Sequence, residues 1–185
     1  NDRLPRDEDC VPLVRRKGKA MKPMLAVDVD DFAQIRYPVY GSPKIDGVRA
    51  LMPERKLMPR SLKIFPNSAT REHFNKFADY LSGFDGELVA GPLNASNMCR
   101  FTSSGLQSID GDPMCTWHVF DLVDDALTFE ERVRLIKLRF SRLGSIGKVA
   151  RVKMIKQTLI RTAGEAEAFE HEQLSRGFEG VVFKS

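Results

Sequence analysis

Residues 42–49 (SPKIDGVR) constrain the fold of this chain more than any other stretch of the sequence. The proline restricts its own backbone, and Asp46-Gly47 is a strong turn signal that lets the chain reverse direction tightly. The segments on either side, 39–40 and 48–52, have the residue types of strands. We therefore expect Lys44 to lie at the end of a β-hairpin-like element, held in place by the backbone.

A lysine held in this way can act as a nucleophile. A lysine amine attacks only in its neutral form, which neighbouring cations or the loss of water favour. Taken alone, a Lys-x-Asp-Gly-x-Arg segment is equally compatible with a plain turn that carries a surface lysine. The rest of the chain has to decide between these two interpretations.

The composition is that of one soluble globular domain. The chain has 185 residues, of which 42% are hydrophobic and 29% charged, so it can bury a substantial core. Its net charge of +4 permits a nucleic-acid partner without requiring one. The sequence has no apolar run of membrane length, so we expect no membrane partner. We also expect the protein to be a monomer.

Cysteine and histidine usage excludes two classes of small, cross-linked domain. The three cysteines show no Cys-x-x-Cys spacing, which argues against a disulfide framework and against a zinc site. The three histidines are scattered and add no metal signature. A reducing, intracellular compartment is the expected location, either the cytoplasm or, in a eukaryotic host, the nucleus.

The two ends of the chain differ from its middle. Residues 1–20 are polar and contain the basic cluster 15–19 (RRKGK), which predicts a flexible leader and is also compatible with contact to phosphate. The ordered part is expected to begin at residue 21. Because the sequence lacks an initiating Met and stops directly after a strand-like segment, we expect it to be a piece of a longer protein.

Local patterns predict an α+β fold with mainly antiparallel sheets flanked by helices. A turn at Asp85-Gly86 should precede a buried strand, and residues 91–113 should be rich in loops. Capping-box patterns begin at Thr128 and Thr162. Strands are expected at 57–61, 86–90, 116–123, 150–157 and 178–184, and helices at 66–82, 128–140 and 162–176.

Several charged residues fall at the ends of these strands. A site that attacks a nucleoside triphosphate needs a nucleophile, cations for the phosphate oxygens, carboxylates for Mg²⁺ and an aromatic face for the base. Each such residue alone is more often a solvated or ion-paired side chain, and a lone aromatic is more often part of the core. The candidates beside Lys44 are Arg49, Arg60, Lys184, Glu87, Glu179 and Phe120.

Five motifs in order favour the functional interpretation of these residues. The segments PKIDGVR, PR, FDGEL, HVFDLV and FEGVVFK begin at residues 43, 59, 84, 118 and 178. Together they resemble the covalent nucleotidyltransferases, and among them the small ATP-dependent DNA ligases of viruses and phages, of the Chlorella-virus type. The similarity runs from residue 22 to the last residue. It implies an ATP-grasp-like adenylation domain over residues 21–185.

The resemblance implies a nucleotide site around Lys44. This lysine is similar to the one that attacks the α-phosphate of ATP, expels pyrophosphate and holds AMP through a phosphoramide bond. The arginines of the first two motifs, Arg49 and Arg60, resemble those that contact the ribose and phosphates. Phe120 resembles the aromatic residue that stacks on adenine. Ser42 and Ile45, beside the lysine, are assigned to the same ATP/AMP site.

The resemblance also implies a divalent metal and a DNA substrate. Glu87 matches the carboxylate that binds the ribose hydroxyl, and Glu87 and Glu179 are the expected ligands of Mg²⁺, with Mn²⁺ as a substitute. Lys184 lies where the family has a basic residue near the phosphate. In such enzymes AMP passes to the 5′-phosphate of nicked double-stranded DNA, and the 3′-hydroxyl then expels it and seals the strand.

Two features depart from the family pattern. Pro59 occupies a position where a serine is usual, which affects one hydroxyl contact and leaves the following arginine in place. A further lysine motif and an OB-fold domain would follow residue 185, so the adenylation domain is expected to be incomplete at its C-terminal end.

Other interpretations stay open from the sequence. Messenger-RNA capping guanylyltransferases share Lys-x-Asp-Gly but have Asp-Gly in the fourth motif, so Glu179 favours a ligase. NAD-dependent ligases usually lack an arginine at the position of Arg49, and RNA ligases differ more in the first motif. A non-catalytic nucleic-acid-binding module that has kept only the fold is the remaining alternative.

Overall fold

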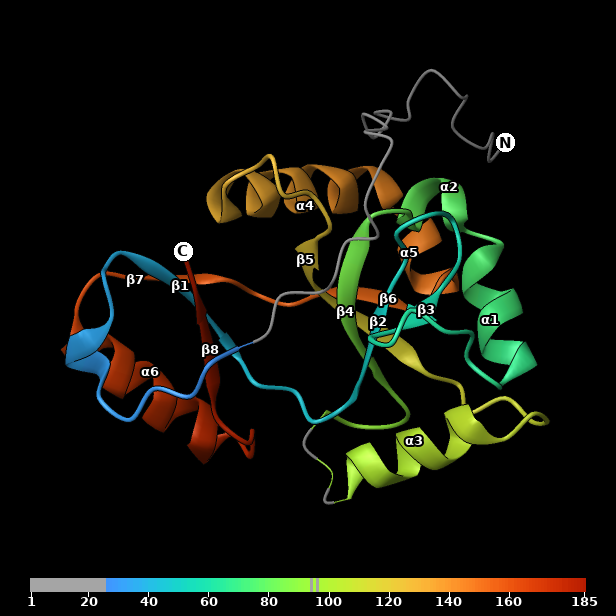
Figure 1. Ribbon diagram of the computed structural model, residues 1–185, viewed down its shortest axis with the longest axis horizontal. Helices are drawn as coiled ribbons and strands as arrows, with labels where there is room; N and C mark the ends of the chain where they lie inside the picture. The colour runs from blue at the N-terminus through green and yellow to red at the C-terminus, as the bar shows by residue number, and fades with distance from the viewer. Residues whose placement is uncertain (1–25, 94, 96) are drawn as a thin grey trace.

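Two β-sheets organise the computed structural model, which describes residues 26–93, 95 and 97–185 (Figure 1). The basic leader expected at residues 1–20 lies outside the described residues. Helices pack on both sheets, and the expected α+β class with mainly antiparallel sheets is confirmed. None of the described helices combines the length and the apolar composition that crossing a membrane requires.

The larger sheet has five strands in the order β3-β2-β4-β5-β6. Its strands are β2 (Val48–Leu51), β3 (Met58–Pro59), β4 (Phe84–Val89), β5 (Thr116–Leu122) and β6 (Val152–Met154). All neighbours pair antiparallel except β5 and β6, which are parallel. The expected strand at 150–157 is therefore shorter than its sequence pattern indicated.

The smaller sheet has three antiparallel strands, with β1 (Val39–Pro43) between β7 (Thr158–Ile160) and β8 (Val181–Lys184). The expected hairpin around Lys44 is therefore wrong, because β1 and β2 belong to different sheets. Residues 44–47 form the connection that crosses from one sheet to the other. A turn signal reports local backbone preference, whereas the partners of β1 come from the far end of the chain.

The described helices frame the two sheets (Figure 1). They are η2 (Phe32–Gln34), α1 (Ser68–Asn75), α2 (Ala78–Leu81), α3 (Met98–Gln107), α4 (Phe129–Leu143), α5 (Ile146–Val149) and α6 (Ala163–Ser175). The capping box at Thr128 is confirmed. Thr162 also caps its helix, but the Glu165 carboxylate accepts the N–H of Arg161 instead of closing the box. The single helix expected at 66–82 is two helices.

Helix α3 lies inside the segment that the sequence assigned to loops. Residues 101–105 (FTSSG) contain weak helix formers, which hid the helix. Met98, Thr102 and Leu106 are buried at helical spacing, and the Thr102 hydroxyl accepts the N–H of Ala90 in the segment after β4 (3.0 Å). Tertiary contact with the large sheet therefore stabilises a helix that local propensity does not favour.

Residues 85–86 are also not a turn, because β4 runs without interruption from 84 to 89. A Cβ at Gly86 would lie 2.3 Å from the backbone oxygen of His118. The glycine is required there because β5 approaches β4 closely, and not because the chain reverses.

The main core lies between the five-stranded sheet and helices α1, α2 and α4. Its large, fully buried side chains include Phe74, Leu81, Phe84, Leu88 and Trp117. The smaller sheet packs one face against α6 through Val39, Ile160 and Ala166. Lys184 of the smaller sheet reaches the Phe120 ring of the larger sheet at 4.3 Å, and Tyr40 packs on Phe129 of α4. The candidate site lies around Phe120.

Candidate active site

Lys44 is held at the crossing between the two sheets by the segment that precedes β8. Its backbone N–H donates to the carbonyl of Gly180 (2.8 Å), and its Nζ lies 3.2 Å from Oε2 of Glu179. The two side chains are 51% and 52% exposed, so the ion pair adds little stability. What this contact does is keep the amine and a carboxylate together at an accessible position.

An apolar cluster lies beside this pair. It consists of Ile45, Val89, Met98 and Ile155, with Leu93, Phe120 and Phe178 packed against it. A pocket of about 310 Å³ adjoins the cluster, and Lys44, Met98, Phe178 and Glu179 are among its lining residues. A ligand in this pocket would lie within contact of the amine and against Met98 and Phe178 of the apolar cluster.

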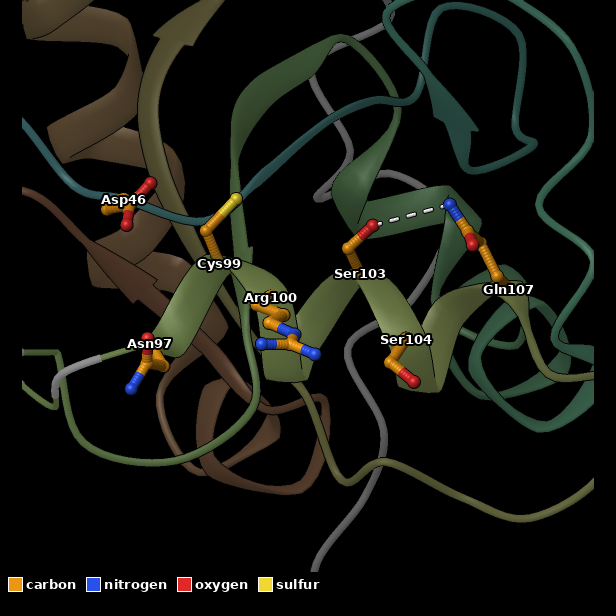
Figure 2. A pocket seen from close by; sticks show the side chains of 7 residues that line it. All are labelled: Asp46, Asn97, Cys99, Arg100, Ser103, Ser104 and Gln107. Atoms are coloured by element: carbon orange, nitrogen blue, oxygen red, sulfur yellow. Dashed lines mark hydrogen bonds between the residues drawn. The ribbon is translucent and has the colours of Figure 1, made fainter.

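A second, more open pocket of about 600 Å³ follows α3 (Figure 2). Figure 2 shows Asp46 and Cys99 near one end of it and Gln107 at the other, with Arg100 and Ser103 along the helix between them. Asp46 and Asn97 line both pockets, so the two adjoin.

A β-bulge sets the orientation of Phe120. Asp85 pairs with Asp121 and Gly86 pairs with Val119, which leaves Phe120 as the extra residue of β5. Val119 and Leu122 belong to the main core, whereas Phe120 packs on the cluster beside Lys44. The bulge therefore turns Phe120 and Asp121 together toward the site, which strict alternation along a strand would prevent.

Arg49 is fixed beside Phe120 by a bidentate ion pair. Its Nε and Nη2 donate to the two carboxylate oxygens of Asp85 (3.1 and 2.7 Å), and its guanidinium carbon lies 5.5 Å from the centroid of the Phe120 ring. Burial raises the pKa of Asp85, and Arg49 opposes that effect. Such a fork holds the cation in one orientation.

Lys184 approaches the same ring from β8. Its Nζ lies 4.3 Å from the Phe120 centroid and donates to Oδ2 of Asp121 (3.1 Å). Burial lowers the pKa of Lys184, and Asp121 counteracts that shift. Oδ1 of Asp121 also accepts a hydrogen bond from Nε of Arg132 on α4 (2.8 Å). Two cations therefore lie close to the Phe120 ring, Arg49 held by the buried Asp85 and Lys184 by the buried Asp121.

Glu87 lies on β4, opposite Arg49 on β2 and His118 on β5. Its Oε2 is buried and has no hydrogen-bond partner among the described residues. Burial raises the pKa of Glu87 to about 8, although the charge of Arg49 opposes the shift. Burial also lowers the pKa of His118 to about 4. Near neutral pH both groups are mostly uncharged, and Glu87 is left with capacity for a further hydrogen bond.

The shifted pKa of Glu87 predicts a pH dependence of stability. The carboxyl ionises near 4.5 when unfolded and near 8 when folded, so between these values the native state binds more protons. The contribution of Glu87 to the free energy of unfolding should therefore fall as pH rises from 4.5 to 8, by on the order of 2–4 kcal/mol. The buried His118 acts in the opposite direction below about pH 6.5, because its lowered pKa makes the unfolded state bind more protons there. Glu87→Gln cannot ionise, so its free energy of unfolding should exceed that of wild type by this amount more at pH 8 than at pH 5, as measured by urea unfolding at both pH values.

The exposed Glu54 supplies the control for that comparison. Glu54→Gln should show the same change in the free energy of unfolding between pH 5 and pH 8 as wild type. An equal change in wild type and Glu87→Gln would contradict the assignment of the buried, protonated carboxyl to Glu87.

The structure brings most of the candidate residues together. Lys44, Ile45, Glu179, Arg49, Phe120 and Lys184 converge on the apolar cluster and its pocket, and Glu87 lies on the same strand as Asp85. Ser42 is buried on β1, paired with Val182 of β8. Arg60 is exposed just after β3 and is not among the residues that line the two pockets.

Two residues that position this site were missed in the sequence. Asp85 and Asp121 are buried and hold Arg49 and Lys184. Asp85 lies in the motif at 84–88 and Asp121 in the motif at 118–123, so these motifs could have identified both residues. The described residues contain no group of three or more His, Cys, Asp or Glu side chains placed to hold a metal ion.

Comparison with known proteins identifies the fold. No family model and no curated protein matches this sequence. Two solved structures of Chlorella virus DNA ligase-adenylate are similar, with TM-scores of 0.74 and 0.75 and sequence identities of 27% and 26%; each alignment covers 89% of this chain. A structure of the Lig E DNA ligases matches in fold at a TM-score of 0.60 and 19% identity, covering 84% of this chain and 57% of that one.

These matches confirm the resemblance to viral-type ATP-dependent DNA ligase adenylation domains, and they confirm the expected fold. The chain has a ligase/nucleotidyltransferase fold. It spans 59–61% of the length of the Chlorella virus structures that it matches.

Proposed function

We propose that residues 21–185 are the adenylation part of an ATP-dependent DNA ligase, in which Lys44 forms a covalent lysyl-AMP with ATP. The observation that carries this proposal is the position of the Lys44 amine. It lies 3.2 Å from a carboxylate, at a pocket beside the apolar cluster that contains Phe120. The similarity to the DNA ligase-adenylate structures supports the same reaction.

In the proposed reaction, the neutral amine of Lys44 attacks the α-phosphorus of ATP. A nitrogen–phosphorus bond forms, the bond from this phosphorus to the bridging oxygen breaks, and pyrophosphate leaves. The amine loses a proton in the process, and Glu179 lies close enough to accept it. Because its backbone and side chain are already held, the Lys44 amine loses less conformational freedom when it attacks.

The remaining candidate residues would bind the nucleotide. Phe120 would stack on adenine, with Ser42 and Ile45 lining the same site. Arg49 and Lys184 would offer positive charge to the phosphates and ribose, and Arg60 is exposed and accessible to the same ligand. The unpaired oxygen of Glu87 would accept a hydrogen bond from a ribose hydroxyl.

The carboxylates fit a divalent metal. Mg²⁺ prefers oxygen ligands and keeps several waters, so one or two carboxylates and the substrate phosphates suffice to hold it. The accessible Glu179 and Glu87 are the residues that would bind it, with Glu87 giving up the proton that burial keeps on its carboxyl near neutral pH. Mn²⁺ would accept the same oxygen donors. When bound, the metal would stabilise negative charge on the phosphate oxygens.

The later steps of the proposed activity act on DNA. AMP would pass from Lys44 to the 5′-phosphate of a nick in double-stranded DNA, and the 3′-hydroxyl would then displace AMP and join the strand. We expect the protein to act as a monomer, in the cytoplasm or, in a eukaryotic host, in the nucleus. The Glu179-Gly180 pair favours this function over RNA capping, because the capping guanylyltransferases have Asp-Gly in this motif.

Labelled nucleotides test the proposal directly. The protein is incubated with Mg²⁺ and ATP labelled at the α-phosphate, or with α-labelled GTP, and is then separated on a denaturing gel. Label from α-labelled ATP and none from γ-labelled ATP is expected, because pyrophosphate leaves. Label from GTP alone would indicate a capping-type guanylyltransferase, and label from neither nucleotide would overturn the proposal.

Phe120→Ala separates a binding role from a packing role. If Phe120 stacks on adenine, the variant should weaken ATP binding by about 1–3 kcal/mol, the range for base–aromatic stacking. A side chain that only fills the core would instead lower stability by about 3–5 kcal/mol and leave ATP binding of the folded protein unchanged. A calorimetric ATP titration and a urea unfolding curve distinguish the two. Phe101→Ala, at a 67% exposed position on α3, should change neither quantity.

A further inference from the structure

The side-chain amide of Gln157 is a buried polar group that the proposed reaction does not use. Gln157 is only 8% exposed, and both its Nε2 and its Oε1 are buried without a hydrogen-bond partner among the described residues. Burying an unpaired amide destabilises a folded protein, because the group loses its hydrogen bonds to water. Such a group is expected to have a hydrogen-bond partner that the described residues do not supply.

The fold directs Gln157 toward the candidate site. Gly41 and Ile160 face α6, because a Cβ at Gly41 would touch the side chains of Phe169 and Ile160. Side chains alternate along strands, so Ser42 on β1 and Lys184 on β8 face the large sheet. Gln157 immediately precedes β7, next to the pairing of Thr158 with Gly41, so continuing the alternation of β7 by one residue would turn it to the same face as Ser42.

The segment that leads to Gln157 adjoins the apolar cluster beside Lys44. Ile155, two residues earlier, belongs to that cluster, and its backbone N–H donates to the carbonyl of Val119 (2.8 Å), next to Phe120. Gln157 therefore lies between the strand end that leads to Lys44 and the strand that carries Phe120.

An amide is suited to the edge of adenine. Its oxygen accepts from the exocyclic amine, while its NH₂ donates to a neighbouring ring nitrogen, as Gln does when it reads adenine in nucleic acids. Guanine presents an acceptor and a donor in the same places, and an amide turned by 180° would match those too. The amine of adenine is therefore the feature that tests the contact most clearly.

We propose that Gln157 hydrogen-bonds the base of the bound nucleotide and favours a purine that carries an amine at position 6. This inference rests on the proposed function, because it takes ATP as the ligand of the site. It adds a specificity residue to the nucleotide site, between Phe120 and Ser42.

Equilibrium binding of two nucleotides tests the inference without any covalent step. ATP and purine riboside 5′-triphosphate, which lacks the amine, are titrated calorimetrically into wild type and Gln157→Leu in the presence of EDTA. Wild type should bind ATP about tenfold more tightly than the analogue, as expected for one or two hydrogen bonds to a buried group. Gln157→Leu should lose this preference by weakening ATP binding more than binding of the analogue, which can make only the contact to the ring nitrogen. The ligand-free variant should also melt at a higher temperature, because the unpaired amide is gone.

Gln173→Leu is the matched control, since Gln173 is equally buried but its Oε1 already accepts a hydrogen bond from Arg176. It should keep the wild-type preference and should not melt at a higher temperature. Gln157→Met, which keeps the length of the side chain, repeats the test if the leucine variant does not fold. Equal ATP binding by wild type and the Gln157 variants, equal binding of both nucleotides by wild type, or no nucleotide binding at all would overturn the inference. ATP binding without transfer of label to Lys44 would instead overturn only the proposed reaction.

Discussion

Replacement of Lys44 by alanine is expected to eliminate labelling of the protein by α-labelled ATP, down to the detection limit of the gel. The amine supplies the atom that bonds to phosphorus, and no other side chain can replace it there. Lys44→Arg should fail as well, because a guanidinium stays protonated at any workable pH. Both variants should melt at the wild-type temperature, since the side chain is half exposed and pairs with an equally exposed Glu179.

Lys148→Ala is the control for that experiment, because Lys148 is an exposed lysine at the end of α5. It should label as strongly as wild type. An adduct that survives in Lys44→Ala, or one that disappears equally in Lys148→Ala, would contradict the assignment of the nucleophile.

Asp121→Ala is expected to have the largest effect on stability, a loss of about 3–5 kcal/mol in the free energy of unfolding. The Asp121 carboxylate is 4% exposed and holds both Arg132 and Lys184, at 2.8 and 3.1 Å. Without it, two buried cations lose the charge that compensates them. Urea unfolding measures the change, and ATP binding should weaken in the same variant because Lys184 loses the contact that keeps it over Phe120.

An exposed ion pair supplies the contrast. Asp79 pairs with Arg55 on the surface, with both side chains more than half exposed. Asp79→Ala should leave the unfolding curve unchanged, because exposed pairs are solvated and screened. If Asp121→Ala shifted the curve no more than Asp79→Ala does, the buried pair would have no special part in holding the site.

The sequence by itself determined those features that depend on residues close together in the chain. The caps at Thr128 and Thr162 predicted where two helices begin, because each side chain bonds a backbone N–H three residues away. The β-branched and aromatic run at 116–123 predicted a core strand. The order of five short motifs singled out Lys44, Glu179 and the other residues of the site as candidates.

Only the tertiary structure decided which segments meet. The turn at Asp46-Gly47 suggested a hairpin, yet β1 pairs with β7 and β8, more than a hundred residues away. The bulge that turns Phe120 toward Lys184 exists because two strands are one residue out of step. The same holds for the pKa of Glu87, which depends on burial between β2 and β5. Strand partners, bulges and desolvation arise from competition among distant segments to bury apolar surface and pair backbone groups, and a local pattern carries no record of which segment wins.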